Sequence, residues 1–283
     1  MTTKRKIGCF LLGMLPLPAS LLIQFLVTIP LSGFAAMGLF VTSRRDGIPF
    51  SSFSERFYEA VTGEVFTDNL QIVYSTVIIV VFGLWLGKAF RKNVRTPLKK
   101  GKSLLALLGG LVLLMIGLQY LTEVVYEWIA SVSPSTATEY EELTEMAGLG
   151  DPSPLMYLYV VVLGPLAEEL LFRGIAMKHF RRIMPFALAN LLQAAMFGIY
   201  HMNLMQGLYT FVAGLIFGLI AEKGGNLLDS ILAHMIFNLL GITGLLYLWA
   251  DNPYFQFVWL PVMVLTLILG AMLLFPGEET AEA

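Results

Sequence analysis

Long apolar stretches recur along almost the whole chain, and they constrain its fold more than any other feature. A helix needs about 20 apolar residues to cross roughly 30 Å of hydrocarbon. The stretches that approach this length are residues 10–40, 70–87, 104–122, 155–172, 186–206, 207–221, 227–249 and 255–275. Because 57% of the residues are hydrophobic and only 13% are charged, the composition excludes a water-soluble globule. The sequence predicts an all-α integral membrane protein with about eight transmembrane helices in a single bundle.

Charged residues between the apolar stretches indicate how the helices are oriented. The densest basic loop contains Lys88, Arg91, Lys92, Arg95, Lys99, Lys100 and Lys102. The positive-inside rule places this loop in the cytoplasm, and a single span over residues 10–40 places the basic residues 4–6 there as well. The acidic stretch 139–151 then lies outside, as does the exceptional pair Arg44–Arg45. We predict a multi-pass protein of the cell membrane with both termini in the cytoplasm.

The first apolar stretch begins like a secretory signal, because it follows the basic residues 4–6. It continues without a charge over residues 7–43 and shows no small-x-small cleavage pattern near its polar end, so we expect a retained anchor. Its prolines would allow either one kinked span or a hairpin of two short spans, and they are Pro16, Pro18 and Pro30. The charge pattern favours the single span.

Ionisable residues inside an apolar span are costly unless they are paired or hydrated, so their presence points to function. Glu168, Glu169 and Arg173 interrupt the fourth apolar stretch. On a helix, Glu169 and Arg173 lie four residues apart with the glutamate on the N-terminal side, which is the favoured orientation for an ion pair. Glu168 lies about 100° away around the helix and is free for another role. One turn earlier, Gly164-Pro165 can kink the helix and admit water beside the carboxylates.

Two further spans carry pairs of residues four apart, which places both members of each pair on one helix face. These pairs are Phe197 with His201 and His234 with Asn238. The third histidine of the chain, His179, falls in a basic turn, where we expect a solvated or interfacial role. A lone histidine or asparagine in a membrane usually makes an interhelical hydrogen bond. A helix bundle gains nothing structural from a further carboxylate, two imidazoles and a carboxamide beyond the Glu–Arg pair. Together these groups therefore indicate an active site.

Other residues in this region have simpler interpretations. Gly214 and Gly218 form a small-xxx-small pair, which is typical of helix packing. Tyr200, Asn203 and Gln206 lie near the end of a predicted span, where we expect them to line a cavity or cap a helix.

At the polar residues the chain resembles the CPBP family, which comprises CAAX proteases and bacteriocin-processing enzymes and is also called the Abi or type II CAAX prenyl endopeptidase family. The family pattern is EExxxR, then FxxxH, then HxxxN or HxxxD, on separate membrane helices. Here the matching segments are Glu168–Arg173, Phe197–His201 and His234–Asn238, and every motif position is present. Each motif alone is weak, whereas three in this order are specific. The resemblance covers residues 155–245.

The resemblance implies a glutamate-dependent intramembrane endopeptidase that needs no cofactor and no metal. By carry-over, Glu168 and His201 would position and deprotonate the attacking water. His234 and Asn238 would stabilise the oxyanion. The supporting residues would be Glu169, Arg173 and Phe197.

The resemblance also divides the chain into three parts within one membrane domain. Residues 1–150 hold N-terminal membrane helices with two polar loops, at 44–69 and 131–153, and match the family only in being hydrophobic. Residues 151–250 form the catalytic core. Residues 251–283 form the last membrane helix and an acidic tail that contains Glu278, Glu279 and Glu282. The two loops are too short and too polar to hold cores of their own.

Three alternative functions fit part of the pattern. In a metal-dependent membrane peptidase, two histidines and two glutamates could hold zinc or a metal pair, although no HExxH motif occurs and Arg173 would compete with the cation. A non-catalytic immunity, scaffold or regulatory protein could bind a kinase or a peptide, but would not need all four polar residues. A transporter would also place charges at mid-membrane, but the chain shows no inverted repeat.

The expected partners are a membrane-embedded peptide or protein substrate and the lipid bilayer. The balance of 18 basic and 20 acidic residues gives no indication of nucleic-acid binding, so no such partner is expected. The oligomeric state is left open, as is the choice between a prenylated CAAX protein and an unprenylated peptide. On resemblance alone, bacterial peptide processing, such as the maturation of a bacteriocin or a signalling peptide, is favoured.

The predicted span boundaries leave one conflict. Counted from the cytoplasmic ends of their spans, His201 lies about 15 residues deep and His234 about seven, a difference near 10 Å at about 1.5 Å per residue. Tilted or broken helices, or different boundaries, are needed to bring the two imidazoles together.

Overall fold

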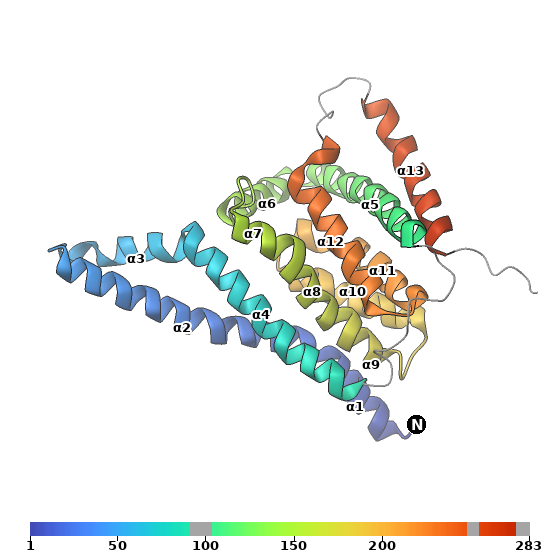
Figure 1. Ribbon diagram of the computed structural model, residues 1–283, viewed down its shortest axis with the longest axis horizontal. Helices are drawn as coiled ribbons and strands as arrows, with labels where there is room; N and C mark the ends of the chain where they lie inside the picture. The colour runs from blue at the N-terminus through green and yellow to red at the C-terminus, as the bar shows by residue number, and fades with distance from the viewer. Residues whose placement is uncertain (91–103, 248–254, 276–283) are drawn as a thin grey trace, which may run out of the picture.

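A computed structural model of the protein describes residues 1–90, 104–247 and 255–275. Over these residues the chain is helical and forms no β-strand. Figure 1 shows most of the helices gathered in one bundle, with the N-terminal helices forming a long arm along one flank. The predicted all-α membrane fold is confirmed.

One helical segment lies at each predicted apolar stretch. Five of these segments are long and apolar enough to cross a membrane, and they are α2 (Pro16–Arg45), α4 (Glu64–Ala89), α5 (Leu104–Val132), the run Pro154–Phe180 and α11 (Leu204–Gly224). The shorter apolar helices are α10 (Phe186–Tyr200), α12 (Leu227–Thr243) and the Val258–Leu274 part of α13 (Phe255–Leu274).

The N-terminal arm consists of α1 (Thr3–Met14), α2 and α4, with η1 (Phe50–Ser52) and α3 (Phe53–Thr62) at its far end (Figure 1). Helix α2 begins directly after α1 and continues through Pro30 for 30 residues, so most of the first apolar stretch forms one long helix and not a hairpin. Of its 30 residues, only Pro16, Ser20, Val27 and Ser43 are buried, which suits a helix largely surrounded by lipid.

Two of the charged segments fall mostly or wholly outside the described residues. Of the predicted basic loop, only Lys88 is described, in the last turn of α4. The acidic tail with Glu278, Glu279 and Glu282 lies beyond residue 275. The polar loop at 131–153 contains α6 (Pro134–Met146), and the hydroxyl groups of Tyr140 in this helix and Tyr209 in α11 are hydrogen-bonded at 3.0 Å.

The helical segment that carries the two glutamates is longer than predicted and is irregular. It passes through α7 (Pro154–Leu158), η2 (Tyr159–Leu163), α8 (Gly164–Glu169), η3 (Leu170–Met177) and α9 (Lys178–Phe180). Since η2 and η3 are π-helical, the short helix α8 lies between two wider stretches of backbone. The predicted end at residue 172 is wrong, because Arg173 is paired and buried and the helix can therefore continue through it.

Helix α10 ends at Tyr200, whereas a span to residue 206 was predicted. Met202 interrupts the chain with a positive φ of 55°, and α11 begins at Leu204. The Asn203 side chain accepts a hydrogen bond from the Gln206 backbone amide at 2.9 Å, which confirms its expected capping role. The predicted span therefore joined the end of one helix to the start of the next.

The two histidines come together although α10 and α12 begin where predicted, at Phe186 and Leu227, so the relative placement of the two helices closes the depth difference. His201 follows the last residue of α10, and His234 lies in the middle of α12. The Phe197 ring contacts both imidazoles, with centroid distances of 4.8 Å to His201 and 5.8 Å to His234. The two histidines therefore lie near the same level of the bundle.

Glycines allow α10 and α11 to approach closely around this level. A Cβ atom at Gly198 or Gly207 would meet the carbonyl oxygen of the other residue. A Cβ at Gly214 would lie 3.1 Å from the Phe197 ring, and one at Gly218 would overlap the side chain of Asn190. The expected packing role of Gly214 and Gly218 is confirmed.

Candidate active site

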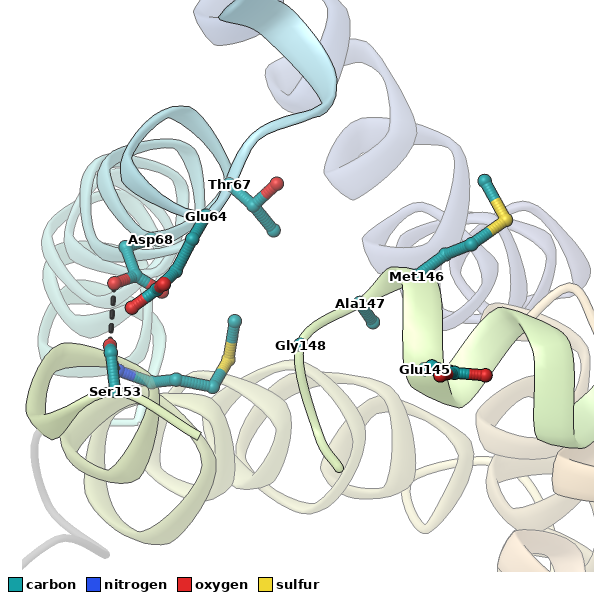
Figure 2. A pocket seen from close by; sticks show the side chains of 9 residues that line it. Glu64, Thr67, Asp68, Glu145, Met146, Ala147, Gly148 and Ser153 are labelled. Atoms are coloured by element: carbon teal, nitrogen blue, oxygen red, sulfur yellow. Dashed lines mark hydrogen bonds between the residues drawn. The ribbon is translucent and has the colours of Figure 1, made fainter. Parts of the chain in front are cut away.

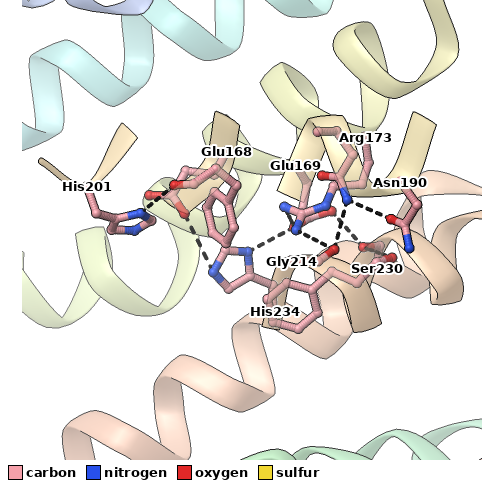
Figure 3. A network of polar contacts seen from close by, with 11 residues as sticks. Glu168, Glu169, Arg173, Asn190, His201, Gly214, Ser230 and His234 are labelled. Carbon is pink, nitrogen blue, oxygen red and sulfur yellow. Dashed lines mark hydrogen bonds and ion pairs between the residues drawn. The ribbon is translucent and has the colours of Figure 1, made fainter. Parts of the chain in front are cut away.

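A fully buried ion pair forms the centre of the polar network. Arg173 Nη1 donates to Glu169 Oε1 at 2.7 Å, and neither side chain is exposed. Two residues of α12 reach the same carboxylate: the Ser230 hydroxyl donates to Oε2 at 2.6 Å, and His234 Nδ1 lies 3.0 Å from Oε1. The predicted pairing of Glu169 with Arg173 is thus present. Ser230 and His234 extend the network from this pair to α12 (Figure 3).

The guanidinium of Arg173 is held on its other sides by aromatic rings and a backbone carbonyl. It lies 4.5 Å from the centroid of Phe197 and 5.2 Å from that of Phe217, distances typical of cation–π contacts. Its Nη2 donates to the Gly214 carbonyl at 3.2 Å, which also accepts from Gln193 at 2.9 Å. The buried cation thus contacts the backbone of α11 directly.

Glu168 is in a different environment from its neighbour. Its side chain is 12% exposed, and its Oε2 lies 3.6 Å from His234 Nε2, slightly beyond direct hydrogen-bonding distance. The phenol groups of Tyr74, Tyr159 and Tyr200 lie within electrostatic range of its carboxylate. Unlike Glu169, this carboxylate is turned toward polar groups and is not enclosed by charged donors.

His234 connects the two glutamates. The Glu169 carboxylate, which also accepts from Arg173 and Ser230, can only accept at Oε1, so His234 Nδ1 carries the proton in this network. A neutral imidazole then presents Nε2 as an acceptor, and that atom faces Glu168. Stacking on Phe217, with centroids 4.5 Å apart, fixes the plane of the ring. The network therefore directs one unprotonated nitrogen at the Glu168 carboxylate.

His201 is oriented in a similar way. Its Nδ1 lies 2.8 Å from the Phe197 carbonyl, an acceptor only, which assigns the proton to Nδ1 and leaves Nε2 unprotonated in the neutral ring. The Thr210 hydroxyl lies 3.3 Å from the same nitrogen. Figure 3 shows the two imidazoles and Glu168 grouped on one side of the buried Arg173. Two acceptor nitrogens from different helices thus accompany the less buried carboxylate.

Asn238 compensates for an irregularity in the glutamate helix. In the π-helical register of η2, the Gly164 backbone amide donates to the Tyr159 carbonyl five residues earlier. Pro165 should donate next, to the Val160 carbonyl, but proline has no N–H group. The Asn238 Nδ2 atom donates to that carbonyl at 2.8 Å instead. One of its two amide protons is therefore engaged with the helix that carries Glu168.

The structure brings the predicted residues of the three motifs into one connected region. Glu168, Glu169 and Arg173 come from the central helical segment. Phe197 lies in α10 and His201 directly follows that helix, while His234 and Asn238 lie in α12. Within the described residues, no group of three or more histidine, cysteine, aspartate or glutamate side chains is arranged to hold a metal ion.

His179 differs from the expectation of a solvated or interfacial role. It is 1% exposed, it packs edge-on against Phe90 with centroids 5.0 Å apart, and its Nδ1 lies 2.9 Å from the Ile175 carbonyl. The prediction was wrong because the neighbouring basic residues were taken to mark a solvated turn, whereas aromatic residues of α4 and its end cover the imidazole.

Sequence reasoning did not single out Ser230 or Thr210. Ser230 precedes His234 by one helical turn, and Thr210 lies two turns into α11, beside His201. A serine at position i−4 from a motif histidine shares its helix face, so the spacing Ser230-His234-Asn238 contained the signal.

Residues 151–240 match the family model described as type II CAAX prenyl endopeptidase Rce1-like. The matched segment contains all three motifs, and it confirms the resemblance that they predicted. The match shows that this segment is similar to the membrane endopeptidases of that family. Searches of curated proteins and of solved structures found no match.

Proposed function

We propose that the protein is an intramembrane endopeptidase that hydrolyses peptide bonds in membrane-associated peptides or proteins. The observation that carries the proposal is the pairing of two unlike glutamates through one imidazole. Glu169 is enclosed by Arg173, Ser230 and His234, whereas Glu168 keeps some exposure and faces the His234 Nε2 atom. The Glu169 carboxylate is thus held in a structural network, whereas the Glu168 carboxylate is available to act as a base.

In the proposed reaction, Glu168 and His201 hold a water molecule and Glu168 removes one of its protons. The water oxygen forms a bond to the carbonyl carbon of the scissile peptide, and the carbonyl oxygen becomes an oxyanion. The proton passes from Glu168 to His234 Nε2, whose position 3.6 Å away allows transfer after a small movement. It then passes to the leaving amine nitrogen as the carbon–nitrogen bond breaks.

His234 and Asn238 are proposed to stabilise the oxyanion. A neutral His234 is an acceptor at Nε2, but the protonated ring becomes a donor, and Glu169 stabilises its charge through Nδ1. Asn238 has a second amide proton beyond the one given to Val160. Removing one oxyanion donor typically lowers kcat by about 100 to 1,000-fold.

The substrate is proposed to be a peptide or protein segment embedded in the cell membrane, with both termini of the enzyme in the cytoplasm. Processing of an unprenylated peptide, such as a bacteriocin or signalling precursor, is the favoured form of this activity over cleavage of a prenylated CAAX protein. A non-catalytic immunity or scaffold role is the competing proposal.

Comparative peptidomics tests the proposed function. Membranes from cells that make the wild type or Glu168→Ala at matched levels are compared for peptides with new termini. We expect a set of products that appears only with the wild type. Identical products from both would refute the catalytic role of Glu168 and favour the scaffold. Loss of the wild-type products on chelation, with recovery on adding zinc, would instead identify a metal-dependent peptidase.

A further inference from the structure

A second polar site lies at the end of the bundle where α4 begins and α6 ends. A cavity of about 180 Å³ opens between these helices and the start of α7. Its acidic lining residues are Glu64 and Asp68 in the first turns of α4 and Glu145 near the end of α6. Figure 2 shows the two α4 carboxylates on one side of the opening and Glu145 on the opposite wall. No basic residue is among those that line it.

Asp68 distinguishes this cavity from a solvated acidic surface. The residue is only 4% exposed, although it is an aspartate with no ion-pair partner among the described residues. Its Oδ2 accepts from the Ser153 hydroxyl at 2.5 Å, while its Oδ1 has no hydrogen-bond partner within the described parts of the chain. A buried carboxylate oxygen without a partner is costly, so a cationic donor that reached the cavity would be bound favourably.

The size of the cavity limits what can enter it. Sites for small organic ligands measure about 300–1,000 Å³, so this cavity suits one side chain better than a complete small molecule. An ammonium or guanidinium group carries several donors and no acceptor, which matches three carboxylates and the Ser153 hydroxyl. The chemistry of the site therefore fits a lysine or arginine side chain.

Two helices connect this cavity to the catalytic residues. Asp68 precedes Tyr74 on α4 by less than two turns, and Tyr74 lies in electrostatic range of Glu168. The helical run that begins after Ser153 reaches Glu168 after roughly 20 Å at about 1.5 Å per residue. An extended peptide covers that length with about six residues at roughly 3.3 Å each.

We infer that the cavity binds a basic side chain of the peptide substrate, about six residues from the scissile bond, and so sets specificity and register. This inference rests on the proposed function, because it takes the occupant to be part of the substrate. The site supplies an attractive charge at one fixed distance from Glu168, and apolar contacts in the membrane supply the remaining affinity.

The test measures binding without cleavage. The full-length Glu168→Ala protein in lipid nanodiscs is titrated with a fluorescent apolar peptide that carries one lysine, and with the same peptide carrying norleucine. We expect the lysine peptide to bind roughly 10 to 100-fold more tightly, as for a charge-assisted hydrogen bond. Adding Asp68→Asn, Glu64→Gln and Glu145→Gln together should remove most of this preference, and Glu64→Gln with Glu145→Gln alone, at exposed positions, should reduce it. Glu142→Gln, on α6 but outside the cavity lining, should retain it.

Carbodiimide coupling locates the bound lysine, because it joins an amine directly to a carboxylate in contact with it. We expect mass spectrometry to find the peptide attached to Glu64, Asp68 or Glu145. Equal affinity for the two peptides, a preference that both sets of changes leave intact, or coupling confined to residues such as Glu142 would overturn the inference. The inference would also be overturned if calcium, but not the peptide, protected these carboxylates from reaction with the carbodiimide. Because binding is measured with the Glu168→Ala protein, the result does not depend on whether the wild type hydrolyses peptides.

Discussion

At the scale of single residues, the stability of the site depends on the opposite charges of Glu169 and Arg173, which are both fully buried. Glu169 has three side-chain donors, and Arg173 is itself sandwiched between two aromatic rings. Burying such a pair is not strongly stabilising by itself, but removing one partner leaves an uncompensated charge. The integrity of this pair therefore governs whether the site forms at all.

Replacing Glu169 by glutamine should destabilise the protein by about 3–5 kcal/mol, because Arg173 stays charged and buried. The double variant Glu169→Gln with Arg173→Met should recover much of that loss, since no charge remains while the glutamine carbonyl still accepts from Ser230. Thermal unfolding of detergent-solubilised protein measures both effects. A double variant as unstable as the single one would show that the pair is not the source of the stability.

Much of this residue-scale arrangement could be predicted from the sequence, and some could not. The i,i+4 spacing was sufficient to pair Glu169 with Arg173, because both lie on one helix. Contacts between helices, such as Ser230 with Glu169, depend on the rotation of α12, which the sequence leaves undetermined. The burial of His179 was missed for the same reason, since its cover comes from Trp85 and Phe90.

At the scale of elements, the π-helical stretch before α8 leaves the Val160 carbonyl without a backbone donor, and Asn238 of α12 supplies one. Asn238→Ala should leave the Val160 carbonyl without its described donor and lower both thermal stability and hydrolysis. Adding Pro165→Ala supplies a backbone N–H group in the π-helical register. We expect this second change to restore unfolding temperature while hydrolysis stays about 100-fold or more below the wild type.

The outcome separates two roles of the same amide. Recovery of both stability and hydrolysis would show that Asn238 only supports the helix and would contradict its proposed contact with the oxyanion. Asn238→Gln serves as a control, because it keeps the amide but moves it by one methylene group.

The close approach of α10 and α11 provides another test at this scale. Gly198→Ala should push the helices apart, because the new methyl group would meet the Gly207 carbonyl, and should destabilise by about 1–3 kcal/mol. Hydrolysis should fall as well, since His201 lies three residues later in the chain. Gly33→Ala in α2, where a Cβ would meet nothing within 4 Å, is the matched control for unfolding temperature.

The existence and order of the helices could be predicted from hydropathy, whereas their ends and irregularities could not. The apolar run from α10 into α11 has no charged residue to mark the break at Met202, which depends on backbone conformation and the Asn203 cap. The π-helical stretches are also invisible to hydropathy, because they change the backbone register and leave the composition unchanged.

At the scale of the whole molecule, the proposed orientation can be tested by cysteine labelling, because the chain has a single cysteine that can be replaced. In a Cys9→Ser background, Glu142→Cys in α6 should react with a membrane-impermeant maleimide on intact cells, because the acidic end is predicted to face outward. Lys4→Cys should react only after permeabilisation. The opposite pattern would invert the predicted topology, and labelling of both on intact cells would contradict the cytoplasmic position of the N-terminus.

The match to the Rce1-like family covers residues 151–240, and the described contacts place that segment against α4 of the N-terminal arm. Tyr74 of α4 and Tyr200 of α10 join the two parts through hydroxyl groups 2.9 Å apart, close to Glu168. The N-terminal part therefore contributes to the wall of the site, although its sequence shows no motif of the family.

Hydrolysis by the purified protein is the decisive measurement for the proposed role of Glu168 as the base. Wild type and Glu168→Gln are reconstituted in nanodiscs, matched in unfolding temperature, and incubated with a library of apolar peptides in ¹⁸O-labelled water. We expect new carboxyl termini carrying ¹⁸O with the wild type and none above background with Glu168→Gln. Equal product formation by the two proteins would contradict that role.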